Sequence, residues 1–272
     1  MTDSDIVLSI RHLHLSILRQ KQEIPILRDL NLDIRKGEKW AIAGESGAGK
    51  SMTMYALTSL LPEKSTVLSG EIRYREEDGT YTDILKLPFS KRSSYCAKKA
   101  SLIFQDSIDA LNPFETIGKQ WNHTLTYSHP EMKKRERTEH ILARLADFGI
   151  TDAQVIRNYP YQLSGGMKQR IAMAMALESG AEILIADEPT TALDAINQRR
   201  VVSFIQKLCE RKNLTLLYIS HDLVLLQEIC THMAVIKDGR IVEIGLANEV
   251  FERPQHAYTK ELIEETRKLF LE

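Results

Sequence analysis

Residues 44–51, with the sequence Gly-Glu-Ser-Gly-Ala-Gly-Lys-Ser, constrain the fold of this 272-residue chain more than any other stretch. Their spacing fits G-x-x-x-x-G-K-[ST], the pattern of a loop that cradles phosphates between a strand and a helix. The apolar residues 40–43 predict the strand, and residues 51–61 predict a helix that ends before Pro62. The stretch therefore predicts a nucleotide site on an α/β fold, whereas a plain glycine-rich turn would not need this context.

The parts of this phosphate loop have separate chemical roles. Glycines let the backbone approach phosphate oxygens without a Cβ in the way, and successive N–H groups form an anion nest at the positive end of the helix. We expect Lys50 to neutralise the β- and γ-phosphates and the Ser51 hydroxyl to ligate Mg²⁺. The predicted nucleotide contacts run through the whole stretch: Gly44, Glu45, Ser46, Gly47, Ala48, Gly49, Lys50, Ser51 and Met52.

Composition excludes several classes of protein. The formal net charge of −1 gives no basic field that would attract nucleic acid. The three cysteines are far apart and form no C-x-x-C pair, which is typical of reduced cytosolic thiols. No signal peptide and no run of about 18 apolar residues is present. We therefore expect a soluble protein, or one that attaches to a membrane only through partners.

The first third of the chain predicts β-structure. Residues 6–17 and 26–34 alternate apolar and polar side chains, as half-buried strands do. Residues 69–74 and 81–87 are further strand candidates on either side of an Asp78-Gly79 turn. We expect a satellite antiparallel sheet beside the parallel strand that leads into the phosphate loop.

The middle of the chain is polar and helical, from about residue 107 to residue 160. Residues 131–148 predict a charged helix with one apolar stripe, and the charge run 133–137 predicts a solvated face. After residue 164 strands and helices alternate again, and Asp238-Gly239 predicts a hairpin. We expect one α/β domain over 1–250 with a helical subdomain at about 107–163, and a short C-terminal helical tail over 251–272.

Two carboxylates follow the apolar run 183–186. An apolar strand of a parallel sheet is buried on both faces, and ligands bind at the carboxyl ends of such strands. Asp187 is then placed to hold Mg²⁺ through water, and Glu188 to orient and polarise the attacking water. The alternative is a strand that ends in a solvated acidic turn, and the phosphate loop upstream favours the functional interpretation.

Three further segments place polar groups at a helix start or a strand end, where they could contact a phosphate, a metal ion or water. Ser164 is an apt N-cap for a helix that runs to about residue 178, and Gly165 and Gly166 leave backbone N–H groups open to a phosphate. Gln105 and His221 each follow an apolar run at a strand end, where an amide could reach a metal or water and an imidazole could donate to a γ-phosphate. Seven other histidines lack such a context: His12, His14, His123, His129, His140, His232 and His256.

Together these residues resemble the nucleotide-binding subunit of an ATP-binding cassette (ABC) transporter over nearly the whole chain. The resemblance implies a P-loop NTPase fold of the ABC type, with a mostly parallel sheet core, an antiparallel β subdomain and a helical subdomain. It implies that Gln105 is the Q-loop residue, that 163–167 is the signature, that Asp194 closes the D-loop at the nucleotide, and that His221 is the switch histidine. The implied catalytic residues are Glu188, His221 and Gln105, and the implied Mg²⁺ ligands are Ser51, Gln105 and Asp187.

Within the family, the chain is most similar to the bacterial peptide/nickel importer group. The resemblance rests on 103–106, 110–113, 159–167, 186–194 and 256–259. Three features depart from the group: Ile17 stands where members place an adenine-stacking aromatic, the chain ends at Glu272 where many carry a longer Cys-containing extension, and Trp121-Asn122-His123 is unusual.

The resemblance also implies partners and a mechanism. Two ATPase subunits, usually non-identical, would pair head to tail, so that ATP lies between the phosphate loop of one and the signature of the other. Two transmembrane permease subunits and a solute-binding protein would complete an importer on the cytoplasmic face of the membrane, with ATP and Mg²⁺ as cofactors and no nucleic acid. The alternatives are a soluble non-transport ABC ATPase and a catalytically silent regulatory cassette. The sequence leaves the solute open among peptides, nickel and metal–chelator complexes.

Overall fold

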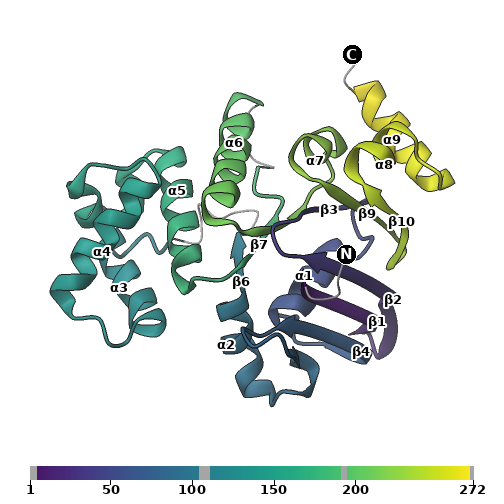
Figure 1. Ribbon diagram of the computed structural model, residues 1–272, viewed down its shortest axis with the longest axis horizontal. Coiled ribbons are helices and arrows are strands. Elements are labelled where there is room, and N and C mark those ends of the chain that lie inside the picture. The colour runs from purple at the N-terminus through teal and green to yellow at the C-terminus, as the bar shows by residue number, and fades with distance from the viewer. Residues whose placement is uncertain (1–4, 104–110, 191–194, 270–272) are drawn as a thin grey trace.

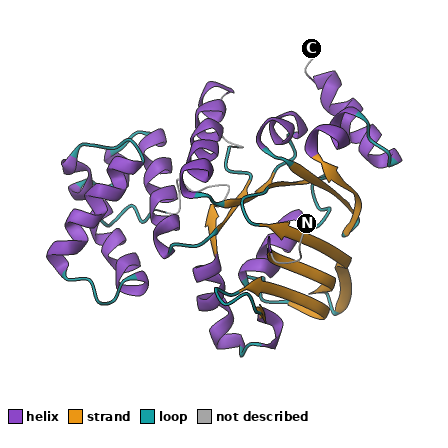
Figure 2. Ribbon diagram, viewed as in Figure 1, coloured by secondary structure: helices purple, strands orange, loops and turns teal. Residues whose placement is uncertain are grey.

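The computed structural model describes residues 5–103, 111–190 and 195–269. Two β-sheets and a group of helices build the molecule, and the helices α3, α4 and α5 lie on the side away from the antiparallel sheet (Figures 1 and 2). The predictions for Gln105 and Asp194 fall outside the described residues. No helix in the described part of the chain has the length and apolar character that a membrane span requires.

The antiparallel sheet has the strand order β2-β1-β4-β5. Its strands are β1 (Ile6–Arg19), β2 (Gln22–Arg35), β4 (Ser65–Arg75) and β5 (Tyr81–Asp83). The satellite sheet is therefore confirmed, but the strand expected at 81–87 is wrong beyond Asp83. The Asp83 side chain accepts a hydrogen bond from the Leu85 N–H and begins a 3₁₀ turn, Ile84–Lys86, which ends the strand.

The central sheet has the strand order β10-β9-β3-β8-β7-β6. Its strands are β3 (Lys39–Ala43), β6 (Ala100–Ile103), β7 (Ile183–Asp187), β8 (Thr215–Ile219), β9 (His232–Lys237) and β10 (Arg240–Leu246). Only the β9–β10 hairpin is antiparallel among these pairs of described strands, and β3 pairs in parallel with both β8 and β9. Every residue of β7 and β8 is buried, as expected for apolar strands covered on both faces.

Helices pack against the central sheet or lie beside it (Figure 1). They are α1 (Lys50–Thr58), α2 (Phe89–Lys99), α3 (Ile117–Ser128), α4 (Lys134–Asp147), α5 (Gly165–Ala176), α6 (Ala195–Lys212), α7 (Leu223–Ile229), α8 (Ala247–Glu252) and α9 (Ala257–Leu269), with short 3₁₀ turns η3 (Ala153–Arg157), η4 (Pro160–Gln162) and η5 (Leu177–Ser179) between them. Two helices are shorter than predicted. α4 begins at Lys134 rather than 131, because the Glu136 carboxylate accepts a hydrogen bond from the Lys133 N–H and caps the helix there. α1 ends at Thr58 rather than near 61, because Ser59 adopts a left-handed conformation.

The apolar core has two parts, one on each face of the central sheet. Ile183 and Ile185 of β7 pack into the cluster shared with the antiparallel sheet, whereas Leu184 and Ala186 pack into the cluster shared with the helices. This alternation is the period-2 geometry of a strand. Because both faces are filled by helices or strands, ligands reach the sheet only at its strand ends, where the predicted site residues lie.

Candidate active site

The carboxyl ends of three neighbouring strands meet at one edge of the central sheet. β3 leads into the phosphate loop, β7 ends at Asp187, and β8 leads to His221. Parallel pairing places these three ends side by side. They form a pocket of about 740 Å³ that is lined by Ile26, Ser46, Gly47, Gly49, Lys50, Ser51, Met52, Asp187, Glu188 and His221.

The glycines of the loop serve two different purposes. A Cβ on Gly44 would lie 2.3 Å from the Ile236 carbonyl oxygen, so this residue must be small for the loop to pack on β9. A Cβ on Gly47 would meet nothing within 4 Å, but its φ of +82° is a conformation that other residues rarely adopt. No side chain caps the N-terminus of α1, and its first-turn N–H groups are therefore left for an anion.

Lys50 is buried inside the loop. Its Nζ donates hydrogen bonds to the carbonyl oxygens of Gly44 (2.7 Å) and Glu45 (2.9 Å). Burial lowers the pKa of Lys50, and the charges of Glu188 and Asp187 oppose that shift. The ammonium is thus held at the base of the pocket by uncharged carbonyl oxygens. A bound phosphate would supply the negative charge that pairs with it.

Asp187 is a buried carboxylate beside Ser51. Burial raises its pKa, while a hydrogen bond from the Ser51 hydroxyl acts in the opposite direction. The Oδ1 atom is buried without a hydrogen-bond partner among the described residues. An unpaired buried oxygen next to a hydroxyl is a donor set that suits a hard divalent cation such as Mg²⁺. The residues present therefore fit the predicted ion.

Glu188 and His221 form a pair above Asp187. The His221 Nδ1 lies 3.0 Å from the Glu188 Oε1, within hydrogen-bond distance. Glu188 has a φ of +44°, which is uncommon for a residue with a side chain, and its N–H donates to the Ile219 carbonyl at 2.9 Å. Such backbone conformations cost free energy and are found at functional sites. The turn directs the Glu188 carboxylate into the pocket rather than along the strand.

The signature residues lie in a different pocket. Ser164 accepts a hydrogen bond from the Met167 N–H at 3.3 Å and caps α5, as predicted. Ser164, Gly165 and Gly166 line a hollow of about 690 Å³ that shares no lining residue with the phosphate-loop pocket. The structure thus brings the loop, Asp187, Glu188 and His221 together, and places the signature elsewhere on the same chain.

Some predicted contacts in the loop face away from the pocket. The Glu45 N–H donates to the Tyr258 hydroxyl at 3.0 Å, and the Ala48 N–H donates to the Glu45 carbonyl at 3.2 Å. Gly44, Glu45 and Ala48 are not among the residues that line the pocket. Their contact with a nucleotide stays a prediction.

Three residues of the site were missed by sequence reasoning. Tyr258 holds the loop, although 256–259 drew notice only through the family resemblance. Ile26 lines the pocket, whereas Ile17, at the position of the family's stacking aromatic, does not. The Gln169 side chain donates to the Pro189 carbonyl at 3.0 Å and ties α5 to the segment after Glu188. Of these three, only Tyr258 lies in a segment that the family resemblance had marked. Ile26 and Gln169 are brought to the site by tertiary packing, which no local pattern in the sequence predicts.

The chain is similar to known proteins over most of its length. The family model described as ABC transporter matches residues 27–191. The dipeptide transport ATP-binding protein DppD of Bacillus subtilis (strain 168) is 37% identical over 97% of this chain and 78% of its own length. The metal-staphylopine import system ATP-binding protein CntD of Staphylococcus aureus (strain Mu50 / ATCC 700699) is 35% identical over 94% and 92%.

Solved structures share the fold. A dimeric ATP-binding cassette in a post-hydrolysis state, bound to ADP and Pi, matches with a TM-score of 0.73 at 24% identity, over 88% of this chain and 98% of that one. CbiO1 of Clostridium perfringens, part of an ABC transporter complex, matches with a TM-score of 0.75 at 23% identity, over 97% and 95%. The family match and the curated relatives confirm the resemblance that the motifs carry. The chain belongs to the ABC transporter family, as one of its ATP-binding chains.

Proposed function

We propose that this chain is the ATP-hydrolysing subunit of an importer for peptides, nickel or metal–chelator complexes. The observation that carries the proposal is the meeting of Lys50, Asp187, Glu188 and His221 in the pocket formed by the phosphate loop. The solute classes come from relatives named for dipeptide, oligopeptide and metal-staphylopine transport. Because both carboxylates and the histidine are in place, the geometry does not favour a catalytically silent cassette.

The residues of the pocket have distinct parts in hydrolysis. Lys50 and the open N–H groups of α1 bind the β- and γ-phosphates. Ser51 and Asp187 would hold Mg²⁺, which supplies positive charge to the phosphate oxygens. The Glu188 carboxylate accepts a hydrogen bond from a water molecule and orients it towards the γ-phosphorus. The water oxygen forms the new bond to phosphorus and gives a proton to the Glu188 carboxylate, and the bond to the β–γ bridging oxygen breaks to release ADP.

His221 acts on the same γ-phosphate. Its ring is held by the Glu188 carboxylate through Nδ1, and Nε2 is then the atom free to face the phosphate oxygens. The side chain is 62% exposed, so the pocket has room for a phosphate beside it. We therefore assign His221 the stabilisation of the γ-phosphate during its transfer to water, with Glu188 as its orienting partner.

The separation of the two pockets supports a site shared between subunits. The Ser164-Gly165-Gly166 helix end is a second anion site that does not reach the chain's own phosphate loop. A second, non-identical ATPase subunit would bring its signature to this loop and take this chain's signature to its own. ATP then stabilises the closed pair over the open pair, and this difference moves the attached permease.

A groove beside the helical group is the place proposed for the permease. It measures about 680 Å³ and is lined by residues of α2, α3 and η5, including Lys98, Tyr127 and Ser179. Tyr127 is 94% exposed although it is large and aromatic, as expected for a side chain that a partner covers. Docking here would hold the chain on the cytoplasmic face of the membrane.

The proposal is tested on the assembled complex. The chain is co-expressed with the permease subunits and the second ATPase subunit of the proposed importer, and ATP turnover is measured in membrane vesicles with and without solute-loaded binding protein. We expect co-purification and turnover that a Lys50→Ala variant loses. Failure to associate with any permease, or fast turnover by a proven monomer, would contradict the proposal and favour the non-transport alternative.

A further inference from the structure

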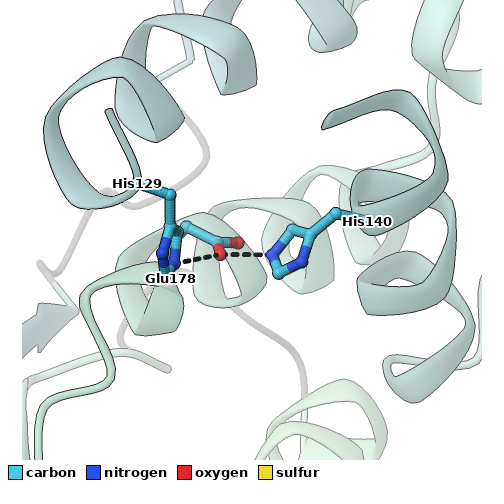
Figure 3. Close-up of side chains that lie close together, drawn as sticks. All are labelled: His129, His140 and Glu178. Carbon is cyan, nitrogen blue, oxygen red and sulfur yellow. Dashed lines mark hydrogen bonds and ion pairs between the residues drawn. The ribbon is translucent and has the colours of Figure 1, made fainter. Parts of the chain in front are cut away.

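Three side chains from separate elements of the helical group point at one another. His129 directly follows α3, His140 lies within α4, and Glu178 lies in η5 directly after α5 (Figure 3). The His140 Nε2 is 2.5 Å and the His129 Nε2 is 3.5 Å from the same carboxylate oxygen, Oε1 of Glu178. Sequence reasoning gave neither histidine a context, because 38 residues separate His140 from Glu178.

Glu178 is a fully buried carboxylate with few partners. Its side chain is 0% exposed, and its second oxygen accepts a hydrogen bond from the Trp121 Nε1 at 2.9 Å. Among the described residues, only His129 and His140 form ion pairs with it. The charge of Glu178 also acts on Lys212, but the Lys212 ammonium forms its ion pair with Asp147. A buried carboxylate is costly unless positive charge or several donors compensate it.

The arrangement suits a divalent metal ion. One ligand atom from each of the three residues lies within 4.8 Å of the other two. In a tetrahedral site with bonds of about 2.0–2.2 Å, ligand atoms lie about 3.3–3.6 Å apart. The distance of 3.5 Å from Oε1 to the His129 Nε2 lies in this range. The His140 ring, which is 25% exposed, would have to move back by about 1 Å to make room for the ion. Two imidazoles and a carboxylate suit zinc and neighbouring first-row metals.

Groups around the three residues match the supports that metal ligands usually have. A ligating carboxylate is held by a further hydrogen bond, and here Trp121 provides it. A ligating histidine often directs its other ring nitrogen towards a carboxylate, and the Glu131 Oε1 lies 3.7 Å from the His129 Nδ1, at ion-pair rather than hydrogen-bond distance. Without an ion, the two imidazoles, whose ring centroids are 5.6 Å apart, would both have to direct a ring nitrogen at the same carboxylate oxygen.

We propose that His129, His140 and Glu178 bind a first-row divalent cation of the zinc class, with a water molecule in the remaining position. The ion would fasten α3, α4 and the end of α5 to one another. Ser128, Pro130 and Ser179, which adjoin these ligands in the chain, line the groove assigned above to the permease. Metal binding therefore stiffens one wall of that groove, although the site itself does not depend on the proposed transport function.

The first test is direct titration. The chain is dialysed against a chelator and titrated with ZnCl₂ in a calorimeter, and the expected result is one saturable equivalent per chain. His129→Ala and His140→Ala should each weaken binding at least tenfold. His123→Ala is the matched control, because His123 is 64% exposed on α3 and lies outside the cluster, so this variant should bind as the parent does. ATP binding by each variant verifies that it is folded.

A second readout is local to the site. The chain has two tryptophans, and Trp40→Phe leaves Trp121 as the reporter beside Glu178. Co²⁺ should quench Trp121 emission saturably, and the visible absorption of the bound Co²⁺ should show tetrahedral coordination. Absence of saturable Zn²⁺ binding, or equal binding by the His129→Ala/His140→Ala double variant, would overturn the proposal. In either case the cluster would be an ion pair only.

Discussion

The Tyr258 hydroxyl accepts a hydrogen bond from the backbone N–H of Glu45 over 3.0 Å. This contact joins the C-terminal helix α9 to the phosphate loop, 213 residues earlier in the chain. The Glu243 carboxylate places the helix by accepting hydrogen bonds from the N–H groups of Gln255 (2.7 Å) and His256 (3.0 Å). The tail predicted from residue 251 onwards is therefore in contact with the phosphate loop, and Tyr258 is a positioning residue for that loop.

Replacement of Tyr258 by Phe should weaken ATP binding without unfolding the chain. The ring and its packing remain, but the partly buried hydrogen bond from the Glu45 N–H is lost, and such a bond is worth about 0.5–1.5 kcal/mol. Since part of this cost falls on the loop, we expect the Kd for ATP to rise by roughly three- to tenfold. Equilibrium binding of a fluorescent ATP analogue measures the change. Tyr127→Phe, at a side chain that is 94% exposed, is the control, and equal affinities for the two variants would refute the role of Tyr258.

Glu188→Gln should separate binding from hydrolysis. The amide keeps the size of the side chain but cannot polarise the attacking water as a carboxylate does, and a positioned base typically contributes about 10²–10⁴-fold. We expect turnover by the assembled complex to fall in that range while ATP still binds. The control is Glu182→Gln, at a half-exposed carboxylate that pairs with Lys36 on the surface. Undiminished turnover by the Glu188 variant would show that another group orients the water.

The sequence predicts the sheet and the pocket better than it predicts the covering helices. Fully apolar runs such as 183–186 and the G-x-x-x-x-G-K-[ST] loop are local patterns, and the parallel sheet brings their ends together. α7 and α8 were not predicted, because helices of 7 and 6 residues are too short to show a helical period. α2 was missed because Cys96 is its buried residue, which leaves no apolar stripe along the helix.

The remaining site features depend on tertiary structure. Glu188 has a left-handed backbone conformation, and its N–H donates a hydrogen bond to the Ile219 carbonyl on the neighbouring strand. A glutamate in the sequence does not predict such a conformation. The contact of Trp121 with Glu178 joins residues 57 positions apart and explains why an indole stands on α3. The roles of Gln105 and Asp194 stay predictions.

Asp187→Asn should stabilise the nucleotide-free chain and impair its metal-dependent activity. Burial raises the pKa of Asp187, so the folded chain holds this proton more tightly than the unfolded chain does. The group's contribution to stability therefore rises as the pH falls through the folded pKa and is least favourable at neutral pH. The amide removes this penalty, and we expect a higher Tm at pH 7 that converges with the parent's at acidic pH.

The same variant should lose about 10–100-fold in Mg²⁺-dependent turnover, the usual effect of removing a group that holds a metal through water. Thermal unfolding and ATPase assays over a Mg²⁺ series measure the two effects. Asp238→Asn, in the exposed β9–β10 turn, is the control for both, since Asn also tolerates its left-handed conformation. A lower Tm at pH 7 for Asp187→Asn would contradict the assigned desolvation.

Gly166→Ala should show whether the signature serves a ligand held by another subunit. Gly166 lies in the first turn of α5, and a Cβ added there would meet nothing within 4 Å in this chain. Alanine is also the better helix former by about 0.5–1 kcal/mol, so the isolated chain should be as stable as the parent or slightly more so. In the shared site, however, the methyl group would stand where the backbone must approach the phosphate bound by the partner. We expect turnover of the assembled complex to fall at least tenfold while ATP binding to the isolated chain is unchanged. Full activity of this variant would mean that the signature glycine makes no close contact across the subunit interface.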